Sequence, residues 1–292
     1  ASYQAISANN AVPVSCDIDP DTMIIDLNDA EKRITKKTKA IMPVFYSGGV
    51  NGYEKIYKFA NKYNLRVIED AAHAFGTKHK NNLIGSIGDI TCFSFDGIKN
   101  ITSGEGGCVI SDDKILIDNI KDLRLLGVIQ DSKQRYLGKR SWQFEVADQG
   151  WRYHMSNLMA AIGIVQLDRL KEFSSARQKI AEFYDSVFLN NHRVQVLKRN
   201  YNEVVPHIYV IQIHDLENRS SLRQQLLEDK IETGIHYFPN HRLKKFYKKD
   251  VELSNTDIIF PKLLSLPIHP EIKKSDVEYI FECLDSRLKK LS

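Results

Sequence analysis

The apolar positions in the first half of the chain form short runs of strand length, separated by stretches with helical period. Residues 53–63 carry apolar side chains three and four positions apart, which predicts an amphipathic helix. This helix leads into a strand that ends on two carboxylates, Glu69 and Asp70. Strand, helix and strand in this order predict right-handed βαβ units and a mainly parallel sheet. The predicted strands are residues 11–17, 39–45, 65–68, 90–95 and 108–110.

Helical period is more frequent in the second half of the chain. Ser156 is a suitable N-cap for a long apolar helix over residues 158–170, because its hydroxyl can accept from an N–H of the first turn. Residues 127–150 are polar and aperiodic, which predicts a loop over a functional site. We expect an α/β fold with a large domain over residues 1–174 and a smaller α+β domain over residues 175–292. The other predicted elements are helices at 24–37, 115–126, 171–189, 219–230 and 274–291, and strands at 194–197 and 208–213.

Composition excludes several classes of protein. With 42% hydrophobic and 27% charged residues, the 292-residue chain has the makeup of a globular protein. Its net charge of +4 is spread along the sequence, so we expect no nucleic-acid partner. No apolar run approaches the ~18 residues of a membrane span and no signal peptide is recognised, so we expect a cytoplasmic protein that binds no membrane. Cysteines 16, 92, 108 and 283 lack metal-type spacing, which predicts reduced thiols and no metal site.

The clearest chemistry lies within residues 67–107. Ligands of an open α/β sheet bind beyond the carboxyl ends of its strands, and Asp70 and Ser94 fall at such ends. Lys99 follows, just ahead of a glycine-rich turn at residues 104–107. A lysine in such surroundings can bond covalently to an aldehyde cofactor if its amine is partly neutral. These residues together therefore suggest a cofactor site.

Taken singly, each of these residues has an ordinary structural explanation. Asp70 alone is more often a helix cap, and Lys99 alone is more often a solvated surface lysine. A run of glycines by itself signals only a turn. The order and spacing of the whole set over about forty residues favours the functional interpretation.

Several sequence blocks together resemble the sugar aminotransferases of the DegT/StrS family, which use pyridoxal 5′-phosphate (PLP) on the fold-type I scaffold. The resemblance extends over essentially the whole chain. The blocks are IEDAAHA at 68–74, GD at 88–89, FSF at 93–95, KNITSGEGG at 99–107, GWRYHMS at 150–156 with AAIG at 160–163, TGIHYFPNH at 233–241, and SLPIHP at 265–270.

The resemblance implies roles for four residues in the first blocks. Lys99 is the residue to which PLP is covalently attached and, once freed, the base that moves the proton between the donor Cα and C4′ of the cofactor. Asp70 pairs with the pyridinium nitrogen, and its charge keeps that nitrogen protonated so that the ring accepts electrons. His73 lies by the ring hydroxyl, and Ser94 holds the phosphate.

Further residues match positions at the edge of the family's active site. Tyr3 stands in the place of an aromatic residue that stacks on the pyridine ring. Arg152 stands where many relatives carry an asparagine or lysine that reaches the PLP phosphate of the partner subunit, and a guanidinium can pair with phosphate. His236, Tyr237 and His241 belong to a segment at the substrate entrance and are candidates to contact the sugar or its pyrophosphate. For each histidine, a structural or surface role is an equal alternative.

The resemblance implies transamination of a nucleotide-linked 4-keto or 3-keto deoxysugar, with L-glutamate or L-glutamine as amino donor. Products of this kind serve polysaccharides such as the O-antigen of lipopolysaccharide. It also implies a homodimer whose active sites are shared between subunits. Some relatives are dehydratases with histidine at the lysine position, and Lys99 argues against that chemistry.

The chain begins at a point that matches a later part of the family pattern. Relatives carry roughly a further quarter of their sequence before the position of Ala1, including an SGT-x-AL motif whose backbone amides hold the PLP phosphate. We therefore expect the large domain to be incomplete at its N-terminal side. This leaves an alternative function, that of a non-catalytic homologue that binds a sugar nucleotide or a partner subunit.

Overall fold

The computed structural model describes residues 1–130, 134, 137–139 and 142–290. Its strands are β1 (Ala40–Ile41), β2 (Arg66–Asp70), β3 (Lys78–His79), β4 (Asn82–Leu83), β5 (Ile90–Ser94), β6 (Gly107–Ile110), β7 (Val194–Val196), β8 (Tyr209–Ile213) and β9 (Leu263–Leu266). The larger sheet has the order β1-β2-β5-β6, in which β1, β2 and β5 are parallel and β6 is antiparallel. The smaller sheet, β7-β8-β9, is antiparallel. A mixed, mainly parallel sheet followed by a smaller sheet confirms the predicted α/β class.

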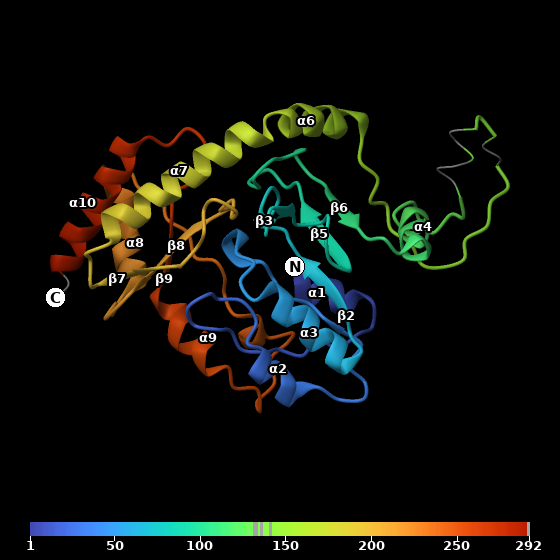
Figure 1. Cartoon of the computed structure of the whole chain (residues 1–292), viewed down its shortest axis with the longest axis horizontal. Coiled ribbons are helices and arrows are strands. Elements are labelled where there is room, and N and C mark those ends of the chain that lie inside the picture. Colours follow the sequence, from blue (N-terminus) through green and yellow to red (C-terminus); the bar gives the residue numbers. More distant parts are fainter. Residues whose placement is uncertain (131–133, 135–136, 140–141, 291–292) are drawn as a thin grey trace.

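Helices surround the four-stranded and three-stranded sheets (Figure 1), and β3 and β4 form a separate antiparallel pair. They are α1 (Ser2–Ala8), α2 (Leu27–Arg33), α3 (Tyr53–Tyr63), α4 (Lys114–Leu123), α6 (Asn157–Asp168), α7 (Leu170–Phe188), α8 (Arg219–Glu228), α9 (Ser254–Ile259) and α10 (Lys274–Lys290), with 3-10 turns η1 (Tyr46–Gly48), η2 (Asn240–Arg242) and η3 (Phe260–Lys262). In Figure 1, α6 and α7 follow one another along one side of the molecule, and α4 projects on the side away from the smaller sheet. None of the helices in the described part of the chain combines the length and apolar character needed to cross a bilayer.

Most of the predicted elements are present, often somewhat shorter than the pattern suggested. The helix α3 and the strands β2, β5 and β6 confirm the predicted βαβ region. Ser156 caps α6 as predicted, because its hydroxyl accepts from the N–H of Met159 at 3.2 Å. Parts of the predicted loop at 127–150, namely residues 131–133, 135–136 and 140–141, lie outside the described residues. The four cysteines are free thiols, as predicted.

The predicted strand at residues 11–17 is wrong. None of these residues belongs to a strand of the described structure, and the side chains of Val12 and Val14 are exposed. Pro13 has no N–H to donate to a neighbouring strand, so the apolar alternation here did not mark a paired strand. The prediction also missed α1, α9 and β9, since none has a strong period of its own.

The strand β8 connects the two halves of the chain, because both of its faces are buried. Tyr209, Ile211 and Ile213 point into the core formed with α7, α8 and α10. Val210 lies on the other face and belongs to a core shared with Ile56 of α3 and other first-half residues. Side chains alternate across a strand, so one strand contributes to both cores. The predicted division at residues 174 and 175 falls inside α7 and stays a prediction.

Candidate active site

Asp70 and Ser94 lie at the same edge of the larger sheet. The strands β2 and β5 are parallel, with Asp70 opposite Cys92, so Ser94 extends two residues further along the neighbouring strand. The chain after β1 joins this edge, because the N–H of Phe45 donates to the Asp70 carbonyl at 3.0 Å. The carboxyl ends of parallel strands therefore meet here, at the position where α/β sheets bind ligands.

The two adjacent carboxylates at the end of β2 have different surroundings. Glu69 is fully buried and accepts hydrogen bonds from the hydroxyls of Thr91 at 2.6 Å and Tyr57 at 2.7 Å. Burial raises the pKa of Glu69 in spite of these donors. Asp70 points to the opposite face of the strand, where it accepts from the hydroxyl of Ser2 at 2.6 Å and the N–H of Ala72 at 3.2 Å. Glu69 is thus a structural residue, and Asp70 is the carboxylate that a ligand can reach.

Lys99 lies on the turn that follows β5. Its N–H donates to the carbonyl of Asp96 at 3.0 Å, and the carboxylate of Asp96 accepts from the N–H of Ile98, which fixes the turn. Burial lowers the pKa of Lys99, while the charges of Asp96 and Asp70 oppose that shift. A partly desolvated lysine with a lowered pKa has the neutral amine needed for covalent bonding to an aldehyde.

The glycines after Lys99 allow the chain to return close to β5. A Cβ at Gly107 would lie 2.6 Å from the carbonyl oxygen of Phe93, which is part of the β5–β6 pairing. Gly106 has a φ of 151°, and a Cβ there would meet the hydroxyl of Ser103 at 2.6 Å. The turn at this point requires residues without side chains.

His73 is the centre of a buried network beside Asp70. Its Nδ1 accepts from the N–H of Ser47 at 3.4 Å, and its Nε2 lies 2.9 Å from the hydroxyl of Tyr237. The ring of His207 packs against it with centroids 4.4 Å apart. Burial, and to a smaller degree Lys99, lowers the pKa of His73 to about 3, so the imidazole is neutral at physiological pH.

His236 belongs to the same region. Its Nδ1 lies 2.8 Å from the hydroxyl of Ser265, and its carbonyl accepts a hydrogen bond from Tyr46. Burial lowers the pKa of His236, and Lys99 adds to the effect. The segment that carries His236 and Tyr237 therefore reaches the carboxyl ends of the strands from the second half of the chain. We call Ser47, Asp70, His73, Lys99 and Tyr237 the polar cluster.

Three predicted site residues make their contacts elsewhere. His241 is buried, and its Nε2 lies 3.0 Å from the carboxylate of Asp257 on α9. Arg152 is exposed and its backbone forms a β-bridge with Leu125. Tyr3 directly follows Ser2, whose hydroxyl donates to Asp70. The ring of Tyr3 packs edge-on against Phe246, with ring centroids 5.3 Å apart. Their roles toward cofactor or substrate stay predictions.

The prediction missed residues that surround the site. Ser47 has no role in the sequence analysis, although it follows the predicted strand at 39–45 and so lies at a strand end. His207 lies two residues before β8 and is buried against His73, with no hydrogen-bond partner for either ring nitrogen among the described residues. Ser2 had no signal, because its bond to Asp70 joins parts of the chain that are far apart.

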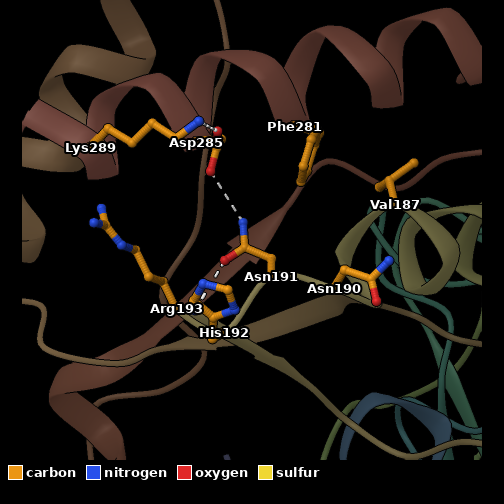
Figure 2. Close-up of a pocket in the computed structure, with 8 residues that line it drawn as sticks. All are labelled: Val187, Asn190, Asn191, His192, Arg193, Phe281, Asp285 and Lys289. Carbon is orange, nitrogen blue, oxygen red and sulfur yellow. Dashed lines mark hydrogen bonds and ion pairs between the residues drawn. The ribbon is translucent and has the colours of Figure 1, made fainter.

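A separate pocket lies at the far end of the smaller sheet and includes none of the predicted site residues. Figure 2 shows the side chains around it, which come from the end of α7, the following turn and α10. Asn191 donates to Asp285 at 3.3 Å across it, and Lys289 pairs with the same carboxylate at 2.6 Å. Its polar groups are thus bonded to each other.

The residues present fit the cofactor that the resemblance implies. PLP needs a carboxylate for its ring nitrogen, an amine for its aldehyde and donors for its phosphate. Asp70, Lys99 and Ser94 supply these groups from one edge of the sheet. The hydroxyl of Ser94 accepts only a long bond of 3.4 Å from the N–H of Asp96, so it can still donate to a phosphate.

The fold matches solved aminotransferases. The aminotransferase TlmJ of Streptoalloteichus hindustanus is 27% identical, with a TM-score of 0.89 over 99% of this chain and 76% of that protein. Spr1654 of Streptococcus pneumoniae, described as a sugar aminotransferase, gives a TM-score of 0.90 at 28% identity over 100% of this chain and 79% of its own. It has been solved in PMP and PLP forms.

The sequence gives the same relationship. GDP-perosamine synthase of Escherichia coli O157:H7 is 34% identical to this chain, over 98% of it and 75% of the relative. The spore coat polysaccharide biosynthesis protein SpsC of Bacillus subtilis is 35% identical, over 94% and 73%. Residues 1–285 match the DegT/DnrJ/EryC1/StrS aminotransferase family. The chain therefore belongs to this family of PLP-dependent sugar aminotransferases, as its site residues predicted.

Proposed function

We propose that the protein transfers an amino group from L-glutamate or L-glutamine to a 4-keto or 3-keto deoxysugar carried on a nucleotide. The observation that carries the proposal is the position of Lys99 on the turn after β5, next to the strand that ends at Asp70. Two relatives support the substrate class by their names, GDP-perosamine synthase and a transaminase for UDP-4-amino-4,6-dideoxy-N-acetyl-β-L-altrosamine. The retained cluster favours this enzyme over a non-catalytic homologue.

Each residue of the site has a separate role in the proposed reaction. Bound PLP withdraws electrons from the Cα of the amino donor and so makes its proton acidic. Asp70 holds a proton on the ring nitrogen of the cofactor, because a carboxylate facing that nitrogen from the end of β2 favours its protonated form. Lys99 takes the proton from Cα, and the burial that lowers its pKa favours the neutral amine that can act as a base. Ser94 binds the phosphate, and the neutral imidazole of His73 lies by the ring hydroxyl.

A second copy of the chain is proposed to complete the site. The helix α6 is apolar around its whole circumference, and none of its residues is buried within one chain. Exposed apolar patches of this kind mark interaction surfaces. We call this surface, formed by α6 with Trp151 and Tyr153 of the preceding segment, the apolar face. Its pairing in a two-fold homodimer would carry the exposed guanidinium of Arg152 to the neighbouring PLP phosphate.

An assay of both half-reactions tests the function. The protein is incubated with PLP, L-glutamate or L-glutamine, and a panel of nucleotide-linked 4-keto and 3-keto deoxysugars, and amino-sugar products are identified by mass spectrometry. We expect amination of one member of the panel. Amino transfer from glutamate to 2-oxo acids without amination of any keto sugar would contradict the proposed substrate class.

The predicted cytoplasmic location stays a prediction.

A further inference from the structure

The hydrogen bonds around His73 have a fixed direction. A backbone N–H can only donate, and that of Ser47 has no acceptor other than the Nδ1 of His73 among the described residues. Ser47 is itself held in place, because its buried hydroxyl donates to the carbonyl of Ile208 at 2.5 Å. Nδ1 is therefore an acceptor, and the proton of the neutral imidazole lies on Nε2.

This direction determines what Tyr237 can do. Its oxygen lies 2.9 Å from Nε2 of His73 and accepts that N–H, so its own proton points elsewhere. No acceptor for this proton is found in the described part of the chain, and the side chain is 50% exposed. Burial, together with the charges of Asp70 and Asp96, raises the pKa of Tyr237 to about 12. Tyr237 is thus a protonated phenol with one unused donor at neutral pH.

The surrounding rings keep this donor in position. His207 packs on His73 at 4.4 Å, and Tyr46 and Tyr237 lie at 6.2 Å and 5.8 Å from the same imidazole, each measured between ring centroids. The Tyr46 hydroxyl also holds the carbonyl of His236, the residue before Tyr237. An N–H bond into the phenol oxygen polarises the phenol and strengthens its own donation.

We propose that Tyr237 donates this hydrogen bond to the ketone oxygen of the sugar substrate, and that His73 is the positioning residue behind it. The inference rests on the proposed function. A ketone oxygen can only accept, which matches the unused donor of Tyr237. Tyr237 bonds to His73, which follows Asp70 by three residues, so its hydroxyl lies at the sheet edge that carries Asp70. The bond polarises the C=O toward attack by the amine nitrogen.

The two half-reactions separate this role from a general effect on the site. Tyr237→Phe removes the donor and keeps the ring, so we expect the amination of the keto-sugar nucleotide to slow by about 100-fold. The half-reaction of PLP-loaded enzyme with L-glutamate, followed by its absorbance change, should slow much less, because its ketone product forms only after the proton has left Cα. Tyr279→Phe is the matched control, since Tyr279 is exposed on α10 and its hydroxyl donates to the carbonyl of Asp229. Equal losses in both half-reactions, or no loss in the sugar half-reaction, would overturn the assignment.

The tautomer of the His73 imidazole can be measured without any substrate. Nitrogen-15 NMR of the imidazole should show a protonated Nε2 and an unprotonated Nδ1, and Tyr237→Phe should shift mainly the Nε2 signal. The opposite tautomer would overturn the inference while leaving the proposed function intact. A parent enzyme that reacts with L-glutamate but aminates no keto sugar would instead overturn the proposed function, and this inference with it.

Discussion

The polar cluster and the apolar face differ in how many of their contacts a single chain supplies. In the polar cluster, Asp70 and His73 already have partners within the chain, contributed by segments far apart in the sequence. On the apolar face, Leu158 is 80% exposed and Ile164 and Val165 are also exposed. Side chains of this kind are stabilised only when another surface removes them from water.

The difference indicates which functions belong to one chain and which to an assembly. The roles proposed for Lys99 and Asp70 need only the larger sheet of a single chain, which places both residues. The role proposed for Arg152 needs a second chain on the apolar face, because Arg152 lies between Trp151 and Tyr153 of that surface. Substitutions in the two regions should therefore have different consequences, the first for chemistry and the second for assembly.

The largest effect is expected at Lys99. Lys99→Ala removes both the covalent link to PLP and the base at Cα, so transamination should fall by more than about 10⁴-fold. The dimer should be unaffected, because Lys99 lies on a turn of the polar cluster. Borohydride reduction of the PLP-loaded parent followed by peptide mapping checks the attachment. Recovery of the label on another lysine would show that the cluster has been built around the wrong residue.

Asp70→Asn should cost somewhat less. Asparagine keeps an acceptor oxygen for the hydroxyl of Ser2 but loses the charge that keeps the ring nitrogen protonated. We expect turnover to fall by about 10³-fold, with Asp70→Glu retaining part of the activity. Steady-state kinetics of the three proteins measures the effect. An Asn variant as active as the parent would mean that another group faces the pyridine nitrogen.

Leu158→Glu tests the apolar face. Burying an unpaired carboxylate at an interface costs at least about 3 kcal/mol, so the dimer dissociation constant should rise by about 100-fold or more. Leu189→Glu is the matched control, because Leu189 is 79% exposed but follows α7 at the smaller sheet. Sedimentation velocity across a concentration series compares them. If both variants assemble like the parent, the apolar face is not the interface.

The smallest effect is expected on the pH dependence of stability, through the buried histidines His73 and His207. Burial lowers the pKa of His207 to about 2 and that of His73 to about 3, against 6.5 for an ordinary histidine. As the pH falls below 6.5, the unfolded chain binds more protons than the folded one, so the free energy of unfolding decreases. His207→Phe should make this decrease shallower by up to about 1.4 kcal/mol per pH unit. Urea denaturation at several pH values measures the slope.

His192→Phe provides the comparison for that slope. His192 is exposed on the turn after α7, where solvent keeps the imidazole hydrated in both states. Its replacement measures how much of any change in slope comes from replacing a histidine at an exposed position. An equal change in slope for both variants would mean that the burial of His207 does not determine the acid sensitivity.

The place of Asp70, Ser94 and Lys99 in the fold could be predicted from the sequence for a physical reason, while their roles stay predictions. Asp70, Ser94 and Lys99 follow strands with clear local patterns, and the parallel sheet brings the ends of such strands together. Ser47 and His207 could not be assigned, because their contacts with His73 join the carboxyl ends of the strands to the second half of the chain.

The strand predicted at residues 11–17 is wrong because these residues have no partner strand. Alternation of apolar residues predicts a strand only if a partner strand is available, and Val12 and Val14 face solvent in the described chain. The sequence did not predict that α6 is exposed in a single chain either. A helix that is apolar all round suggests burial, but the pattern does not tell whether its own chain or another provides the cover.

Mixing two defective variants tests most directly whether the polar cluster of one chain works with the apolar face of another. Lys99→Ala lacks the reactive amine, and Arg152→Glu replaces a phosphate-binding cation with a charge that repels phosphate. In a mixed dimer, one site combines an intact Lys99 from one subunit with an intact Arg152 from the other. After unfolding and refolding together in equal amounts, transamination should recover to about a quarter of the parent activity, because half of the dimers are mixed and each has one intact site of two. Activity no greater than the sum of the separate variants would contradict the shared site.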